Sequence, residues 1–575
     1  MNVTTPQNFI DIAHQWTKAP FDESTQKDTR ELIEKGGPEL EDAFYKNMEF
    51  GTGGMRGIMG VGTNRINKYT LGGATQALSD YLKISFPSED KISVAIAFDC
   101  RQNSDVFAQL VADVLSANGI HVYLFESLRP TPELSFAVRH LNCQAGIVLT
   151  ASHNPKEYNG YKVYWNDGAQ LVPPHDKGVI DRAKNIRIED IQFSANKELI
   201  QIIGKDIDEA FLNAVVQQSL TKEGKEDLKI VFTSLHGTSI NGLPQALKMA
   251  GFTDVHIVEA QAKPDGTFPT VESPNPEEPS ALKMAIDQAN EINADLVIGT
   301  DPDADRIGIA VRNAEGEMQI MNGNQTASML TWYLLEQWKQ QGKLTGKEFI
   351  CQTIVTTDLM RDIANSYQVD TETTLTGFKW IADVIRKYEG EKKFIGGGEE
   401  SFGFMIGDFV RDKDSISSAM IVSEIAALAK AKGSSFYTEL LEMYKNFGLY
   451  HEGLISIVKK GKSGSEEIAQ MMHDLRNNPP AELGGYKVIK WDDVSSGVST
   501  DILTGATSTL PLPSSNVLQF YLENGSKVTA RPSGTEPKIK FYFSVKGKLE
   551  NTADYDHLLK GLLSQIEDIK RDLDI

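Results

Sequence analysis

Cysteine is scarce in this chain, which has three in 575 residues. Cys100, Cys143 and Cys351 lie far apart and form no C-x-x-C pair. A disulfide framework needs paired cysteines, and a zinc site needs closely spaced thiolates or imidazoles. The spacing favours neither, and we expect a reducing compartment.

Long apolar runs are also missing, and no cleavable leader is expected. The first residues, MNVTTPQNFIDIAHQW, show no cationic start followed by an apolar core and a small-residue cleavage site. The most apolar later stretch, residues 415–431, contains Glu424 and is too short and polar to cross a bilayer core of roughly 30 Å. We therefore expect a cytoplasmic protein with no membrane partner.

Positive charge is in deficit, because 58 Lys and Arg face 79 Asp and Glu, a formal net charge of −21. Nucleic-acid binding takes its affinity from basic surface, so no nucleic-acid partner is expected. The chain has no G-x-x-x-x-G-K-[ST] motif, which argues against a P-loop nucleotide site. A small anionic substrate would need cations gathered in one cleft.

Strand and helix patterns alternate regularly through most of the sequence. Three strand, helix, strand, helix, strand series begin near residues 90, 228 and 348. Each series ends on a polar loop, and these loops are 151–155, 301–306 and 397–401. After residue 446 the pattern changes to antiparallel-type strands, with a helix near 555–573.

The chain is long enough for three to five domains of roughly 100–200 residues. We predict an α/β protein with three related mixed-sheet domains and a C-terminal α+β domain. The predicted ranges are 1–220, with an N-terminal helical extension, then 221–322, 323–446 and 447–575. Ligands of open α/β sheets gather at the carboxyl ends of the strands, so the polar loops are the candidate sites.

Asp301, Asp303 and Asp305 alternate directly after an apolar strand. A hard divalent cation prefers several carboxylate oxygens, and an extended loop places alternate side chains on one side. An EF-hand also begins D-x-D-x-D, but this chain has Arg306 and Arg312 where that loop needs Gly and Glu. A solvated acidic turn is the alternative, and three alternating aspartates favour a metal site.

Ser152 lies in the short loop Ala151-Ser152-His153-Asn154-Pro155. Its hydroxyl is a candidate acceptor of a phosphoryl group, although most Ser-His pairs are turn or capping residues. A Ser/His hydrolase is the competing interpretation. No G-x-S-x-G elbow surrounds Ser152, and in extended backbone His153 would point away from it and serve badly as its base.

Two further loops carry groups that suit a sugar phosphate. Arg531, Ser533, Gly534 and Thr535 offer a guanidinium, two hydroxyls and a glycine that lets backbone approach an anion, with a surface turn as the alternative. The glycine run 396–398 reads as flexible backbone before Glu399, Glu400 and Ser401, whose groups suit vicinal sugar hydroxyls. A tight turn is the alternative there.

Together these motifs resemble the α-D-phosphohexomutase superfamily in order and spacing. The four motifs are Thr150-Ala-Ser-His-Asn-Pro155, Asp301-Pro-Asp-Ala-Asp-Arg306, Gly398-Glu-Glu-Ser401 and Arg531-Pro-Ser-Gly-Thr-Glu-Pro-Lys538. Gly51-Thr-Gly-Gly-Met-Arg56-Gly57, Asp99-Cys-Arg101 and Gly377-Phe-Lys379 also look like loops of that family. The segment 160–165 and the chain length look closer to the branch that includes phosphopentomutases, glucose-1,6-bisphosphate synthases and some bacterial phosphoglucomutases.

The resemblance implies four domains around a central cleft, with a role for each matched residue. Ser152 would be the phosphoserine, and one of its phosphate oxygens would bind Mg²⁺ together with Asp301, Asp303 and Asp305. The implied catalytic residues are Ser152, His153, Lys162, Lys379 and Arg56, and the implied substrate-binding residues are Arg306, Glu399, Ser401, Arg531, Ser533, Gly534 and Thr535. Arg101 is a further cation implied for the cleft.

The implied activity is a phosphoglucomutase that interconverts glucose 1-phosphate and glucose 6-phosphate, with glucose 1,6-bisphosphate as intermediate and activator. A phosphomannomutase or phosphopentomutase of the same mechanism, or a non-catalytic sugar-phosphate sensor, is the alternative. Many relatives place a histidine shortly after Glu-x-Ser, but none follows Ser401 here until His451, so the acid/base group stays open. A monomer or weak dimer that acts on small sugar phosphates is expected.

Overall fold

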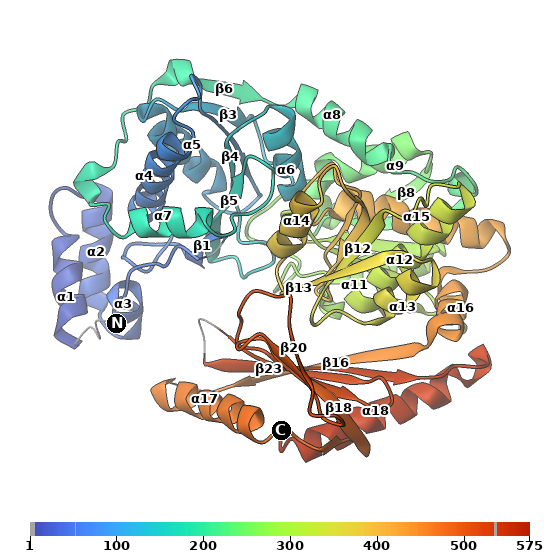
Figure 1. The fold of residues 1–575 in the computed structure, drawn as a ribbon. Coiled ribbons are helices and arrows are strands. Elements are labelled where there is room, and N and C mark those ends of the chain that lie inside the picture. Colours follow the sequence, from blue (N-terminus) through green and yellow to red (C-terminus); the bar gives the residue numbers. More distant parts are fainter. Residues whose placement is uncertain (1–5, 52, 460, 534–536) are drawn as a thin grey trace.

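The structure, a computed structural model, describes residues 6–51, 53–459, 461–533 and 537–575. Four β-sheets follow one another along the described chain (Figure 1). Helices surround the first three, and the fourth lies apart from them at the red end of the colour scale. Among the described residues, no helix combines the length and apolar character needed to cross a membrane.

The predicted N-terminal helical extension consists of α1 (Pro6–Gln15), α2 (Glu23–Lys35) and α3 (Pro38–Phe44). Aromatic side chains hold it together and against the first domain. Trp16 stacks on Phe21 with ring centroids 4.3 Å apart, and both rings meet Tyr69 edge-on. Because Tyr69 belongs to α4, this cluster fastens the extension to the first sheet.

The first sheet has the strand order β1-β5-β4-β2-β3-β6. Alternate residues of its strands enter two cores, since Val94 and Ile96 face the core under α4, α5 and α7 while Ala95 and Ala97 face the core under α6. Its elements are β1 (Gly54–Ile58), α4 (Lys68–Ser85), β2 (Ser93–Phe98), α5 (Ser104–Ala117), β3 (His121–Phe125), α6 (Thr131–His140), β4 (Ala145–Leu149), β5 (Tyr158–Trp165), α7 (His175–Ala183), β6 (Ile200–Ile203) and α8 (Lys205–Val216).

The second and third sheets have the orders β11-β10-β9-β7-β8 and β13-β12-β14-β15. The domain around the second sheet contains β7 (Lys229–Thr233), α9 (Leu243–Ala250), β8 (Asp254–Ile257), α10 (Glu259–Ala262), α11 (Pro279–Ile292), β9 (Leu296–Thr300), β10 (Ile307–Arg312) and β11 (Met318–Met321). The domain around the third sheet contains α12 (Gly323–Gln340), β12 (Glu348–Thr353), α13 (Leu359–Ser366), β13 (Asp370–Thr374), α14 (Phe378–Lys387), β14 (Lys393–Gly398), β15 (Phe404–Ile406), α15 (Ser415–Ala431) and α16 (Phe436–Phe447).

One topology is repeated in all three sheets. A central strand (β2, β7 or β12) pairs in parallel with two others, and the later of these (β4, β9 or β14) then pairs with an antiparallel strand. This confirms three related mixed-sheet domains. The added antiparallel strand means that each predicted polar loop joins two neighbouring strands, so the loop is anchored at both ends.

The glycine run is not the flexible backbone expected from the sequence. Gly396, Gly397 and Gly398 lie buried in β14 and pair with β12 and β15. A Cβ atom at Gly397 would come within 2.5 Å of the carbonyl oxygen of Cys351. These glycines therefore permit close strand packing rather than mobility.

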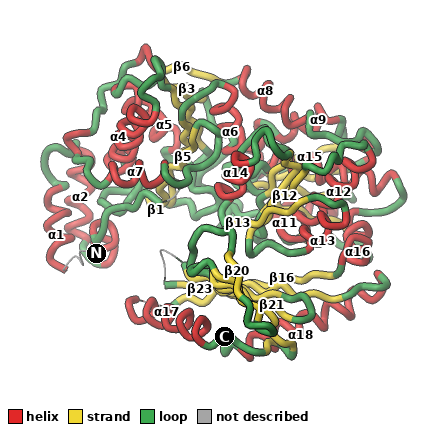
Figure 2. The backbone as a smooth tube through the Cα atoms, in the orientation of Figure 1, coloured by secondary structure: helices red, strands yellow, loops and turns green. Residues whose placement is uncertain are grey.

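The C-terminal domain is an antiparallel sheet with helices, as predicted (Figure 2). Its elements are β16 (Leu449–Val458), α17 (Gly461–Asn477), β17 (Glu482–Leu483), β18 (Tyr486–Asp493), β19 (Val498–Asp501), β20 (Thr507–Thr509), β21 (Leu518–Leu522), β22 (Lys527–Pro532), β23 (Lys538–Gly547) and α18 (Tyr555–Asp572). The exact boundaries of the four domains remain a prediction.

Candidate active site

A cleft of about 620 Å³ lies where loops from all four sheets converge. The first sheet contributes residues around β1 and β5 and the Ser152 loop, and the second contributes the aspartate loop. The third contributes the loops at 376–378, 399–401 and Lys413, and the fourth contributes Leu454, Arg531, Lys540 and Tyr542. Motifs that are hundreds of residues apart in sequence therefore meet in one place.

Ser152 follows β4 and is 2% exposed. Its hydroxyl donates a hydrogen bond to Asp301 Oδ2 over 2.6 Å, which joins the first two domains at this atom. The backbone of Ser152 is left-handed, with a φ of 51°, and its N–H donates to Thr150 Oγ1. Such a conformation is rare for a residue with a side chain, so the surrounding loop must hold it in place.

The expectation that His153 points away from Ser152 is wrong. The left-handed turn at Ser152 replaces the extended backbone assumed from the sequence, and His153 Nδ1 lies 3.2 Å from Ser152 Oγ. Burial, together with the charges of Arg306 and Arg56, lowers the pKa of His153 to about 3. The imidazole beside Ser152 is therefore neutral near pH 7.

Asp301, Asp303 and Asp305 follow β9 and are all buried, with ligand atoms within 4.8 Å of one another. They converge through a tight turn rather than a simple extended loop. Ala304 is left-handed with a φ of 57°, and Asp301 Oδ1 accepts hydrogen bonds from the N–H groups of Asp305 and Arg306. The grouping that the alternation predicted is present, although its backbone differs.

The surroundings of the triad leave particular oxygens available for a cation. Lys162 donates to Oδ2 of both Asp303 and Asp305, at 2.7 and 3.1 Å, and Thr131 also donates to Asp303 Oδ2. Oδ1 of Asp303 and Oδ1 of Asp305 are buried without a hydrogen-bond partner among the described residues. Buried orphaned carboxylate oxygens are costly, so the donor set fits a hard metal ion.

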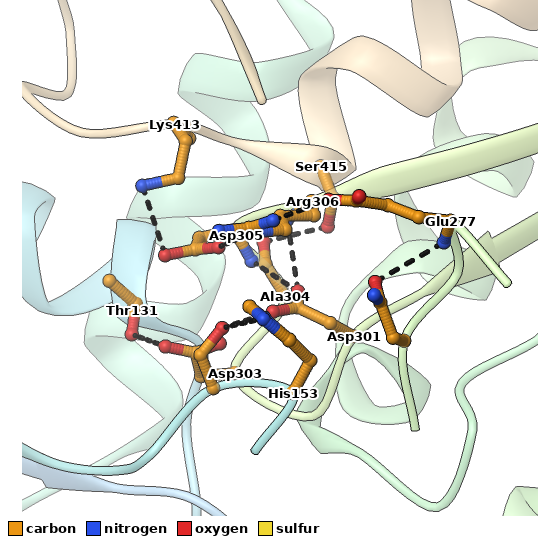
Figure 3. Close-up of polar contacts among 12 residues, drawn as sticks. Thr131, His153, Glu277, Asp301, Asp303, Ala304, Asp305, Arg306, Lys413 and Ser415 are labelled. Atoms are coloured by element: carbon orange, nitrogen blue, oxygen red, sulfur yellow. Dashed lines mark hydrogen bonds and ion pairs between the residues drawn. The ribbon is translucent and has the colours of Figure 1, made fainter. Parts of the chain in front are cut away.

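Lys413 is a cleft cation that the sequence analysis did not single out (Figure 3). Its ammonium lies 3.2 Å from Asp305 Oδ2, beside Lys162. Burial alone would raise the pKa of Asp305, but Lys162, Lys413 and Arg306 hold it well below its usual range. A Cβ atom at Gly403 would lie 2.0 Å from Lys413 Cδ, so the glycine provides the path for this side chain.

The other predicted cations differ in position. Arg306 and Arg56 both line the cleft; Arg306 pairs with Glu277, and the more exposed Arg56 donates to Asn154 Oδ1 over 3.0 Å. Arg101 is buried behind the Ser152 loop, and its guanidinium contacts backbone rather than the cleft. The Lys379 ammonium lies 5.0 Å from the centroid of the Trp380 ring, at the start of α14.

The predicted sugar-binding loop joins β14 to β15. Glu399 and Ser401 both line the cleft, and Glu399 Oε1 accepts a hydrogen bond from the N–H of Gly377 over 2.7 Å. Glu400 also lines it, and burial together with the charge of Glu399 raises the pKa of Glu400 to about 7. This loop therefore offers two acidic groups and a hydroxyl to a ligand.

The predicted phosphate loop follows β22, with Arg531 in the cleft beside Lys540 and Tyr542. The N–H of Ser533 donates to the carbonyl of Lys538 over 2.7 Å. Gly534 and Thr535 lie outside the described residues. A guanidinium and an ammonium at this end of the cleft make it suited to an anion.

Three family models match successive parts of the chain. They are described as phosphoglucomutase/phosphomannomutase alpha/beta/alpha domains I, II and III, and they match residues 47–189, 209–316 and 322–444. A phosphoglucomutase of Staphylococcus aureus (strain MRSA252) is 39% identical over 512 residues, 88% of this chain and 91% of that protein. A phosphoglucomutase of Staphylococcus epidermidis (strain ATCC 35984) is 38% identical over 544 residues, 94% of this chain and 96% of that protein.

Solved structures share the fold. A putative phosphomannomutase from Thermus thermophilus has a TM-score of 0.66 at 21% identity, covering 91% of this chain and 98% of that one. The open form of pp63/parafusin, a phosphoglucomutase from Paramecium, has a TM-score of 0.67 at 17% identity, covering 92% and 96%. With its repeated sheets, its shared cleft and these similarities, the chain belongs to the phosphoglucomutase/phosphomannomutase family of the α-D-phosphohexomutase superfamily.

Proposed function

We propose that the chain is a phosphoglucomutase that interconverts glucose 1-phosphate and glucose 6-phosphate through a phosphorylated Ser152. The observation that carries the proposal is the 2.6 Å contact between Ser152 Oγ, which lines the cleft, and Asp301 of the buried aspartate triad. The curated relatives that are 38–39% identical over about nine tenths of the chain are phosphoglucomutases. Their similarity supports the same sugar here.

Asp301, Asp303 and Asp305 are the residues that would hold Mg²⁺, together with an oxygen of phosphorylated Ser152. The triad offers oxygen ligands only, which is the preference of Mg²⁺. When bound, the ion supplies positive charge that stabilises the phosphoryl group during transfer. Lys162 and Thr131 keep Oδ2 of Asp303 occupied, so Oδ1 is the oxygen that would remain for the ion.

In the first step the phosphoryl group leaves Ser152 Oγ and bonds to a free hydroxyl oxygen of the sugar phosphate. The hydroxyl proton passes to a base, and the product is glucose 1,6-bisphosphate. After the intermediate turns over within the cleft, the bond between its other phosphorus atom and the sugar oxygen breaks and that phosphoryl group bonds to Ser152 Oγ. The freed sugar oxygen takes back the proton held by the base, and the isomeric monophosphate leaves. Arg306, Lys162 and Lys413 surround the reacting position and offset the charge that develops during transfer.

The remaining cleft residues would bind the sugar and its second phosphate. Glu399 and Ser401 would accept and donate hydrogen bonds to ring hydroxyls, while Arg531 would hold the phosphate that is not reacting, together with Ser533, Gly534 and Thr535. Arg56, which lines the cleft, would face the substrate, and Lys379 at the start of α14 would be a further cation for it. Lys379 and the neutral His153 are candidates for proton transfer.

A coupled assay tests the function. Purified protein with Mg²⁺ and a trace of glucose 1,6-bisphosphate should convert glucose 1-phosphate to glucose 6-phosphate, and removal of Mg²⁺ with a chelator should stop it. The Ser152→Ala variant should be inactive while still folded. Turnover that survives in Ser152→Ala would exclude the phosphoserine role.

The alternative functions give different results in the same type of assay. Faster turnover of mannose 1-phosphate or ribose 1-phosphate than of glucose 1-phosphate would favour a phosphomannomutase or phosphopentomutase, and the latter would support the branch that includes phosphopentomutases. Binding of sugar phosphates without turnover would favour a sensor. A cytoplasmic location and a monomeric or weakly dimeric state remain predictions from the sequence.

A further inference from the structure

Arg101 lies in the loop after β2 with its side chain fully buried. Its guanidinium donates four hydrogen bonds, all to backbone carbonyls of one segment. One terminal nitrogen reaches the carbonyls of Pro155 and Tyr158, at 2.8 and 3.0 Å, and the other reaches those of Ser152, at 2.6 Å, and Asn154. A single planar guanidinium therefore holds four carbonyls of the loop that carries Ser152.

The loop that carries Ser152 needs such a restraint. Ser152 is left-handed, which costs roughly 1–2 kcal/mol for a residue with a side chain. The direction of its hydroxyl toward Asp301 depends on that backbone conformation. Because the guanidinium is rigid and its donors have fixed directions, it restrains the carbonyl of Ser152 together with three later carbonyls of the same loop, which a lysine ammonium cannot do.

Residues of both domains that meet at Ser152 enclose the Arg101 guanidinium. Asp99 Oδ2 lies 3.4 Å from Arg101 Nε, and the Phe268 ring of the second domain covers the guanidinium, 5.2 Å from ring centroid to Cζ. A Cβ atom at Gly266 would lie 2.5 Å from the backbone nitrogen of Gln102, so these loops pack directly. Burying a charge is costly unless it is paired and hydrogen-bonded, and here the acceptors are the carbonyls of the Ser152 loop.

We propose that Arg101 is a positioning residue that sets the orientation of the Ser152 hydroxyl by clamping the carbonyls of its loop. The inference rests on the proposed phosphoserine function and replaces the sequence-based expectation of a cleft cation. Arg101 acts through backbone and contacts neither the sugar nor its phosphates. Its loss therefore lowers the rate of phosphoryl transfer and leaves substrate binding largely intact.

The test compares Arg101→Lys with a matched control, Arg182→Lys. Arg182 also belongs to the first domain, donates to a backbone carbonyl, that of Gly178, and lies over an aromatic ring, that of Tyr81, but outside the cleft lining. The measurement is the single-turnover rate at which glucose 1,6-bisphosphate phosphorylates the dephosphorylated enzyme. We expect Arg101→Lys to slow this rate by about 10- to 100-fold, the scale of a misplaced reacting group, with KM little changed. Arg182→Lys should match the wild type.

Two further readouts separate positioning from simple loss of folding. Guanidinium chloride at millimolar concentration, far below denaturing levels, should restore transfer to Arg101→Ala and should leave Ser152→Ala inactive. Amide exchange of residues 152–158 should accelerate in Arg101→Lys and stay unchanged in Arg182→Lys, a result that does not depend on catalysis.

The proposal is overturned if Arg101→Lys is phosphorylated at the wild-type rate, or if the fall in its rate only matches its fraction of unfolded protein. It is also overturned if the amide exchange of residues 152–158 is the same in Arg101→Lys as in the wild type. A wild-type enzyme that accepts no phosphate would instead refute the proposed function, and the role in catalysis with it. Accelerated exchange in that case would still show the clamp on the loop.

Discussion

At the scale of single residues, the site is organised by which oxygen of each carboxylate already accepts a hydrogen bond from the protein. Lys162 and Thr131 occupy Oδ2 of Asp303, whereas its Oδ1 has no hydrogen-bond partner in the described chain. Oδ1 of Asp305 is in the same state. The protein thus fixes the orientation of the ligands before a cation arrives, which reduces the cost of binding it.

Asp303→Asn is expected to weaken Mg²⁺ binding by more than about tenfold, because even outer contacts of a metal ligand are worth about 10- to 100-fold. Titration calorimetry on the dephosphorylated enzyme measures this directly, and Mg²⁺-dependent turnover should disappear as well. Asp287→Asn, which alters an exposed carboxylate paired with Lys283, is the control. Equal Mg²⁺ affinity in both variants would contradict the assignment of the triad.

The loops that meet at the cleft could be predicted from the sequence, but the directions of their side chains could not. The alternation of Asp301, Asp303 and Asp305 indicated a metal site because three carboxylates in such a loop have few other uses. No local pattern marks Lys413, whose place depends on packing against Gly403 and Asp305. The direction of His153 was misjudged because the left-handed turn at Ser152 cannot be deduced from the surrounding sequence. The burial of Arg101 depends on contacts with the Ser152 loop, which is distant in sequence.

At the scale of elements, each catalytic loop is held between two paired strands. The parallel pairing within each sheet could be anticipated from three repeated βαβαβ patterns, since short apolar runs that alternate with helices favour parallel sheets. The antiparallel strands β5, β10 and β15 were not predicted individually. The three residues of β15, Phe404–Ile406, are too few to be distinguished from a loop without knowledge of the partner strand. This reason does not apply to β5 and β10, which have 8 and 6 residues.

The N-terminus of α15 provides a test at this scale. Asp414 caps the helix by accepting from the N–H groups of Ile416 and Ser417, at 2.9 and 3.2 Å. Asp414→Ala should lower the free energy of unfolding by about 0.5–2 kcal/mol, whereas Asp414→Asn keeps the acceptor and should cost less. Chemical denaturation of the three proteins measures the difference, and equal stabilities would contradict the capping role.

The same residue predicts a pH dependence. Burial raises the pKa of Asp414 to about 6, so the folded protein holds its proton more tightly than the unfolded chain does. The free energy of unfolding should therefore fall as the pH rises from about 4, the ordinary value for Asp, to about 6. Asp414→Asn removes this contribution, so its stability relative to the wild type should rise across that window. A difference that is constant with pH would refute the shift.

At the scale of the whole molecule, the fourth domain brings its cations to the cleft through contacts with the third. Lys527 of β22 lies 2.9 Å from Asp358, and Gln519 donates to the carbonyl of Ile354 over 2.7 Å. A small apolar cluster that includes Val355, Val494 and Tyr542 lies between the same domains. The position of Arg531 at the end of β22 depends on this junction.

Lys527→Met should destabilise the protein and raise KM for the sugar phosphate. Removing one partner of a buried ion pair costs about 3–5 kcal/mol, and less is expected here because Arg361 also contacts Asp358 at 2.8 Å. Lys430→Met breaks a more exposed pair with Asp295 and should cost about 1 kcal/mol or less. Unfolding curves and steady-state kinetics measure both effects, and equal behaviour of the two variants would contradict the role of the junction.

The central claim is that four domains meet to pass a phosphoryl group through Ser152. Intact-mass measurement with peptide mapping, after incubation with glucose 1,6-bisphosphate and Mg²⁺, tests it most directly. The account predicts one added phosphate on the peptide that contains Ser152, and its loss when the enzyme is mixed with an excess of glucose 6-phosphate. A protein that stays unphosphorylated, or that carries the phosphate on another residue, would contradict it.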